Sequence, residues 1–155
     1  MRFLLFSALS AALLVGCNTS KPVASEETAI ISITHGTNFG HCRGYCRKEV
    51  IFSEDKVQYI ESSVDSGKNP EKKEQFDYTE TQWKNLSGKV NPESFEKLEE
   101  TYGCPDCADG GSEYIEIKTL KGTKRVTIEF NKEAPQLEPL LTELRTQRKA
   151  LLKSE

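Results

Sequence analysis

Two adjoining stretches of alternating apolar and polar residues, 113–120 and 125–130, restrict the possible fold more than any other part of this 155-residue sequence. Lys121 and Gly122 form a turn signal between them. A period of two places alternate side chains on opposite faces of a strand, and a short turn between two such strands is typical of a β-hairpin. The apolar residues that share one face are Ile115 and Ile117, then Val126, Ile128 and Phe130. The sequence therefore predicts an antiparallel sheet with one apolar face.

The remainder of the chain is expected to add three strands and three helices. β-Branched and apolar residues predict strands at 29–34, 45–52 and 56–62, with a turn at 53–55. The glycine-rich segment 35–44 and the polar segment 64–75 are expected to be loops. The predicted order is β-β-β-α-α-β-β-α. This order predicts the α+β class, with an antiparallel sheet of about five strands and helices packed on one face.

Capping signals place two short helices in the middle of the chain. A capping box that begins at Thr79 opens a helix to Leu86, and Asn91 followed by Pro92 opens a second, which is expected to end near Gly103. The last helix is expected to begin near Pro135 and to pack an apolar stripe against the sheet. The residues of this stripe are Leu137, Leu140, Leu141, Leu144, Leu151 and Leu152.

The first 17 residues contain Arg2, a mostly apolar run at 3–15, and Cys17. The run is shorter than the ~20 residues of a membrane-spanning helix and is typical of an export signal. Residues 14–17, Leu-Val-Gly-Cys, resemble the lipobox of bacterial lipoproteins. The resemblance implies that residues 1–16 are a signal peptide and that Cys17 is the lipid attachment site. The alternative is an ordinary secretory signal that contains a cysteine.

The resemblance to lipoproteins also implies a location in the bacterial cell envelope. The membrane is then contacted only through the N-terminal lipid, which holds a protein stably when it has two or more acyl chains. Asn18 follows the cysteine in place of the aspartate that usually signals inner-membrane retention, which implies the outer membrane, facing the periplasm. Residues 17–28 are expected to form a flexible tether, and residues 29–155 a single α+β domain.

Charge and motifs exclude several functions. The formal net charge is −3, and the basic residues form no stripe, which argues against nucleic-acid binding. The sequence has no Gly-x-Ser-x-Gly motif, no phosphate-binding loop and no acid at triad-like spacing from a histidine. We therefore expect no cofactor, and a binding or scaffolding role rather than an enzymatic one. The protein or small-molecule partner is not identified by the sequence.

Three stretches resemble a family of small bacterial envelope domains of unknown function. They are 40–45 with the hairpin at 55–59, the loop 102–109, and 113–130 followed by 134–137 and the leucine helix. The family often has a cysteine four residues before the position of Cys42, where this chain has Asn38. The family's local pairing therefore cannot be carried over. The resemblance implies the same fold and no particular activity.

Four cysteines remain beyond the lipid attachment site: Cys42, Cys46, Cys104 and Cys107. An even number in an exported protein favours two disulfides. Because Cys46 is expected in an extended strand, it lies too far from Cys42 for a local bridge. We therefore favour bridges between the 42/46 loop and the 104/107 loop, with local bridges as the alternative. By parity with the apolar residues of its strand, Cys46 is expected to face the core.

A second class of function would use the same thiols differently. Four thiolates, with His41 nearby, would hold a zinc ion, although C-x3-C is a less usual half-site than C-x2-C. Alternatively, Cys104 and Cys107 would form a redox-active pair. The oxidising envelope favours disulfides over zinc, and the predicted helix C-terminus before Cys104 disfavours a thiolate there.

The other residues with possible chemistry are expected to have structural roles. His35 and His41 are expected to be solvent-facing or hydrogen-bonded loop histidines. Asp106, Asp109 and Glu113 crowd one loop, but they do not match the spacing of an EF-hand. We therefore expect these acids to serve in turns and caps.

Overall fold

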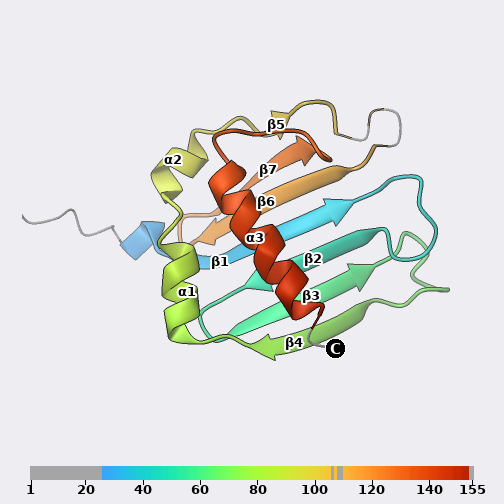
Figure 1. Ribbon diagram of the computed structural model, residues 1–155, viewed down its shortest axis with the longest axis horizontal. Helices are drawn as coiled ribbons and strands as arrows, with labels where there is room; N and C mark the ends of the chain where they lie inside the picture. Colours follow the sequence, from blue (N-terminus) through green and yellow to red (C-terminus); the bar gives the residue numbers. More distant parts are fainter. Residues whose placement is uncertain (1–25, 106, 108–109, 154–155) are drawn as a thin grey trace, which may run out of the picture.

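The computed structural model describes residues 26–105, 107 and 110–153, and these form one seven-stranded sheet with helices packed on it (Figure 1). Neighbouring strands are antiparallel except β5 and β7, and the order is β4-β3-β2-β1-β6-β7-β5. The expected α+β class is confirmed, with seven strands rather than about five. Cys17 and the predicted signal peptide lie outside the described residues, as does most of the tether. The strands are β1 (Ile30–Asn38), β2 (Arg47–Phe52), β3 (Lys56–Ser62), β4 (Lys72–Asp77), β5 (Thr101–Tyr102), β6 (Ser112–Thr119) and β7 (Thr123–Glu129).

The two strands that the sequence did not predict, β4 and β5, are the edges of the sheet. β4 was expected to be mostly loop because its only apolar residue is Phe76, which pairs with Val57 of β3. An edge strand needs little apolar surface, and charged side chains on it discourage pairing with other chains. β5 has only two residues, which pair in parallel with β7.

Strand β1 continues four residues beyond its predicted end, through Gly36 to Asn38. A glycine within a strand often marks the close approach of another group. Here that group is the Tyr114 ring, which lies so close to Gly36 that a Cβ would approach it well within 3.0 Å. Gly36 is paired with Tyr114 on one side and with Glu49 on the other, and the Tyr114 hydroxyl donates to Glu49. The extension of β1 brings His35 and Thr37 into the sheet.

The helices supply the second layer of the core. They are η1 (Glu26–Thr28), α1 (Glu80–Ser87), α2 (Pro92–Glu96) and α3 (Glu138–Leu151), and α3 crosses one face of the sheet (Figure 1). The Thr79 capping box and the Asn91 cap are confirmed, although α2 ends at Glu96 instead of near Gly103. No helix in the described residues has the length and apolar composition that crossing a membrane requires. Of the predicted apolar stripe, Leu137, Leu140, Leu141 and Leu144 are buried, Leu151 is partly buried, and Leu152 is 37% exposed, so the prediction is wrong for Leu152. The buried leucines join Ile33, Ile115, Ile117, Val126 and Ile128 in one cluster.

Both disulfides are local, so the favoured cross-pairing is wrong. Cys42 bonds Cys46, and Cys104 bonds Cys107, with Cα–Cα distances of 5.6 and 5.5 Å. The predicted separation of Cys42 from Cys46 fails because β2 begins only at Arg47, and Gly44, at φ +84°, turns the chain back first. Cys46 is buried, as its parity predicted. Because each bridge closes a very short loop, each is expected to stabilise the fold by only about 2 kcal/mol in the chain-entropy model.

Candidate functional site

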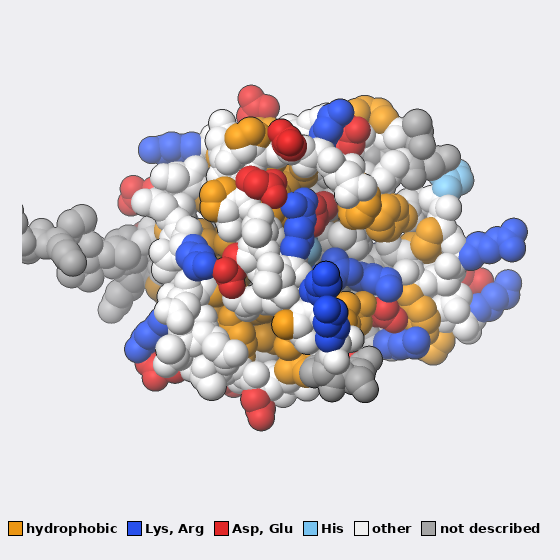
Figure 2. Space-filling model, in the orientation of Figure 1, with side chains coloured by type: hydrophobic (Ala, Val, Ile, Leu, Met, Phe, Trp, Pro, Cys, Tyr) orange, Lys and Arg blue, Asp and Glu red, His pale blue; other side chains and the backbone are white. Residues whose placement is uncertain are grey.

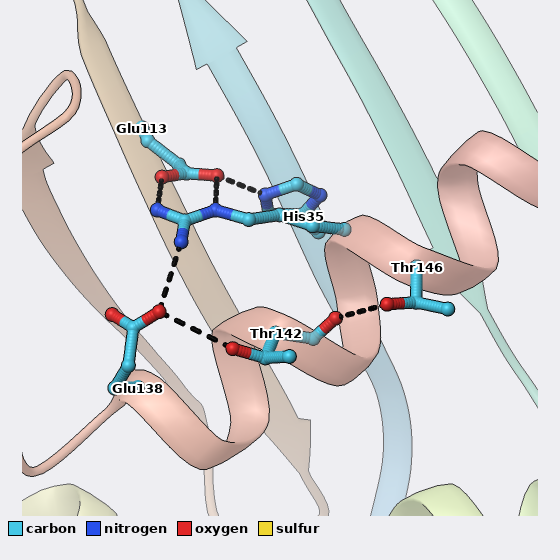
Figure 3. Close-up of polar contacts among 6 residues, drawn as sticks. His35, Glu113, Glu138, Thr142 and Thr146 are labelled. Atoms are coloured by element: carbon cyan, nitrogen blue, oxygen red, sulfur yellow. Dashed lines mark hydrogen bonds and ion pairs between the residues drawn. The ribbon is translucent and has the colours of Figure 1, made fainter.

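A buried histidine and a buried glutamate meet an arginine, whose side chain is 38% exposed, between β1, β6 and α3 (Figure 3). His35 is 1% exposed and Glu113 is 3% exposed. The His35 Nε2 atom lies 2.6 Å from Glu113 Oε1. Arg145 donates to both Glu113 oxygens, with an Nε–Oε1 distance of 2.9 Å, and its third nitrogen donates to Glu138 Oε1 at 3.1 Å. We call His35, Glu113 and Arg145 the buried triplet.

Strand register explains how two polar residues reach the helix-covered face. His35 is paired with Ile115, and Glu113 is two residues before Ile115 on the same face of β6. His35 and Glu113 are therefore diagonal neighbours on adjacent strands, within reach of long side chains. Arg145 follows the buried Leu144 on α3, which carries its guanidinium to the edge of the core.

Glu113 is ionised in the folded protein. Burial alone would raise its pKa, but the hydrogen bonds from His35 and Arg145, together with their charges, outweigh burial and lower the pKa to about 2. The same hydrogen bonds have the opposite effect on Arg145: the contact with Glu113 raises the pKa of its guanidinium. An ionised carboxylate only accepts hydrogen bonds. The proton in the short His35–Glu113 contact is therefore on His35 Nε2.

The other ring nitrogen, His35 Nδ1, has no partner. Among the described residues it is the one buried side-chain nitrogen or oxygen without a hydrogen bond. Such atoms are rare in native proteins, and each calls for an explanation. No hydroxyl or thiol among the described residues is bonded to Nδ1, so a third protein group of a catalytic triad is not seen beside it there. The arrangement is suited instead to holding charged groups in fixed positions.

A groove of about 430 Å³ opens beside the buried triplet, between the C-terminal half of α3 and the strand ends. Figure 2 shows basic side chains gathered around a hollow on this face. Phe130 and Leu152 give the groove an apolar wall. Its charged lining consists of Glu113 and four cations, which are Arg145, Arg148, Lys149 and Lys153. We call this the α3 groove.

The cations of the α3 groove are mostly uncompensated. Arg145 is paired with Glu113 and Glu138. In the part of the chain that the structure describes, no carboxylate forms an ion pair with Arg148, Lys149 or Lys153. These three side chains give the groove a positive potential although the whole chain is acidic.

The structure corrects the predictions for the histidines and acids. His35 is not a loop residue but a buried residue of β1, whereas His41 is exposed in the loop before β2. Glu113 is not a turn or cap residue but the centre of the buried triplet, and Asp106 and Asp109 lie outside the described residues. The sequence did contain a signal, because Glu113 has the same parity as Ile115 and Ile117 and so must face the core.

The four cysteines form two local disulfides in the described structure. No group of three or more His, Cys, Asp or Glu among the described residues is placed to hold a metal ion. The Cys104 backbone N–H donates to Glu129 Oε2 at 2.9 Å.

Comparisons with models of known protein families and with curated proteins returned no match.

Proposed function

We propose that this protein is a lipid-anchored envelope protein that binds a small organic anion in the α3 groove. The observation that carries the proposal is the set of three cations, Arg148, Lys149 and Lys153, that line the groove without a carboxylate partner among the described residues. The volume of about 430 Å³ lies within the range of small-molecule sites. An anionic ligand would supply the missing negative charge.

The buried triplet supports this role by fixing one wall of the groove. Two guanidinium nitrogens of Arg145 donate to Glu113 and the third donates to Glu138. These hydrogen bonds prevent the Arg145 side chain from folding into the groove. Phe130 and Leu152 offer apolar contact to the carbon skeleton of the ligand. Binding sites for small ligands usually combine a few fixed polar groups with an apolar wall.

Binding of cyclohexanecarboxylate to the full-length protein in phosphatidylcholine nanodiscs tests this function. The double variant Arg148→Gln with Lys149→Gln is expected to weaken binding at least about tenfold, because a hydrogen bond to a charged group contributes about 1.5–3 kcal/mol. Glutamine retains helix propensity, so α3 should persist. Isothermal titration calorimetry measures the affinity of each protein.

The matched control is Lys118→Gln with Lys121→Gln, which removes the same charge from exposed positions outside the groove. Its affinity should equal that of the wild type. If both double variants bind equally well, or if the wild type does not bind the anion, the function is wrong.

The lipid anchor is proposed from the lipobox resemblance at residues 14–17. The two local disulfides are consistent with an oxidising compartment. Cys17→Ser is expected to prevent lipidation and to leave the protein out of the membrane fraction after cell fractionation, because no acyl chain would hold it there. Normal processing and membrane retention of Cys17→Ser would contradict the anchor.

A further inference from the structure

We infer that the ligand of the α3 groove is an organic dianion, whose two anionic groups lie about one helical turn apart and bind Lys149 and Lys153. This inference rests on the proposed function, because it describes the ligand of the same groove. The ligand class is a dicarboxylate, or a similar molecule in which an apolar skeleton separates two anionic groups.

Three basic residues follow one another along the end of α3 at intervals of four residues. They are Arg145, Lys149 and Lys153, and all three line the α3 groove. The Lys153 backbone N–H donates to Ala150 at 3.3 Å, so the chain still turns as a helix there. Residues at this interval lie on one face of a helix, about 6 Å apart along its axis. Lys149 and Lys153 therefore present two positive charges to the groove, one turn apart.

The carboxylates near α3 are paired with cations other than these two lysines. Arg145 already has two carboxylate partners. The remaining acid of α3, Glu143, pairs with Lys89 at 2.6 Å and does not line the groove. The helix dipole favours cations near a C-terminus, but on every side of the helix. It does not explain why every basic residue of α3 lines one groove, at a spacing where like charges repel each other.

A ligand with two separated anionic groups matches this arrangement better than a ligand with one. Two ammonium groups can converge on a single carboxylate only against their mutual repulsion. Two anionic groups one helical turn apart can each bind one lysine. Phe130 and Leu152 line the same groove, so they can contact the carbon skeleton that joins the two groups.

The position of the groove favours a ligand from solution over a lipid headgroup. The Lys121 backbone N–H donates to Glu27 at 3.1 Å, which fixes η1 beside the turn between β6 and β7. Phe130 and Asn131, which line the groove, follow the other end of β7, roughly 20 Å away at the usual rise per residue. Figure 1 shows η1 and the far ends of β1 and β7 on opposite sides of the sheet. A chain anchored before residue 26 is therefore held by the end of the sheet remote from the groove.

The test compares cyclohexanecarboxylate with the trans-1,4- and trans-1,2-dicarboxylates of cyclohexane, by isothermal titration calorimetry of the full-length protein in phosphatidylcholine nanodiscs. At about pH 8 both isomers are dianions. The 1,4-isomer holds its carboxylates well apart, whereas the 1,2-isomer holds them side by side with the same total charge. We expect the 1,4-isomer to bind about fivefold more tightly than the parent anion or the 1,2-isomer, which is the upper effect of one exposed ion pair.

Variants of Lys153 test whether this residue binds the second anionic group. Lys153→Gln should still bind the parent anion but lower the preference for the 1,4-isomer to about one, because one cation of the pair is lost. Lys153→Arg keeps the charge and should keep the preference. Lys118→Gln is the matched control, because Lys118 is exposed outside the groove, and it should also keep the preference.

The outcomes separate this inference from the anion-binding function. If the parent binds but the two isomers bind equally, or if the preference survives in Lys153→Gln or is lost in Lys153→Arg, the dianion inference is wrong and the function stands. Loss of all binding in Lys153→Gln would place a single anionic group at Lys153, which also overturns the inference. If no anion binds the wild type, both fail. Nanodiscs that contain cardiolipin, whose headgroup has two phosphates, should leave these affinities unchanged, and a loss of affinity there would contradict a ligand from solution.

Discussion

Replacing Gly36 by alanine is expected to lower the free energy of unfolding by about 3 kcal/mol, as overpacking and the loss of a buried hydrogen bond combine. The new Cβ would overlap the Tyr114 ring, which is 3% exposed and lies across Gly36. Tyr114 would have to leave this position and so lose its hydrogen bond to Glu49. It would also lose the Arg125 guanidinium, which lies 4.1 Å from its ring centroid.

A double-mutant cycle with Tyr114→Ala measures whether the two residues are coupled. Without the ring, Gly36→Ala should be neutral or slightly stabilising, since glycine is unfavourable within a strand. Urea unfolding of the four proteins gives the coupling energy. An equal cost of Gly36→Ala with and without Tyr114 would show that the ring does not require the glycine.

Glu113→Gln is expected to destabilise the protein at neutral pH by about 3 kcal/mol, because it removes a carboxylate whose pKa is lowered from 4.5 to about 2. The folded protein binds this proton less readily than the unfolded chain. The contribution of Glu113 is therefore fully present above about pH 4.5 and is lost as the pH falls toward 2. The wild type should lose stability through this window, and Glu113→Gln should lose less.

Glu116→Gln is the control for this prediction. Glu116 is on the same strand and is paired with Arg125 at 2.8 Å, but both side chains are partly exposed. Such a pair contributes about 1 kcal/mol or less. Urea unfolding of each protein between pH 2 and 7 separates the two cases. An acid profile of Glu113→Gln that follows the wild type would show that Glu113 is not stabilised by His35 and Arg145.

The elements that could be predicted are those with strong local signals. Alternation predicts β6 and β7, and the cap residues Thr79 and Asn91 predict the starts of α1 and α2. The extension of β1 could not be predicted in this way, because a glycine usually interrupts a strand and Gly36 is explained only by Tyr114, from a distant part of the chain. Strand β4 has a weak signal because an edge strand buries little.

The candidate site could be predicted only in part. The parity of Glu113 places a carboxylate inside the protein, where a positive partner is needed. The parity of Glu113 does not identify either of its partners. To identify His35, one must know the full length of β1 and the β1–β6 register, and to identify Arg145, one must know the path of α3 across the sheet. The α3 groove could not be predicted either, because it forms only where α3, crossing the sheet, leaves the strand ends uncovered.

An NMR titration of the isotopically labelled protein with cyclohexanecarboxylate measures most directly whether the α3 groove binds organic anions. We expect chemical-shift changes confined to the groove, at residues such as Thr37, Phe130, Lys149 and the His35 ring. The changes should be absent from the opposite face of the sheet, around Tyr114. No change at saturating anion, or changes centred on another surface, would show that the α3 groove does not bind organic anions.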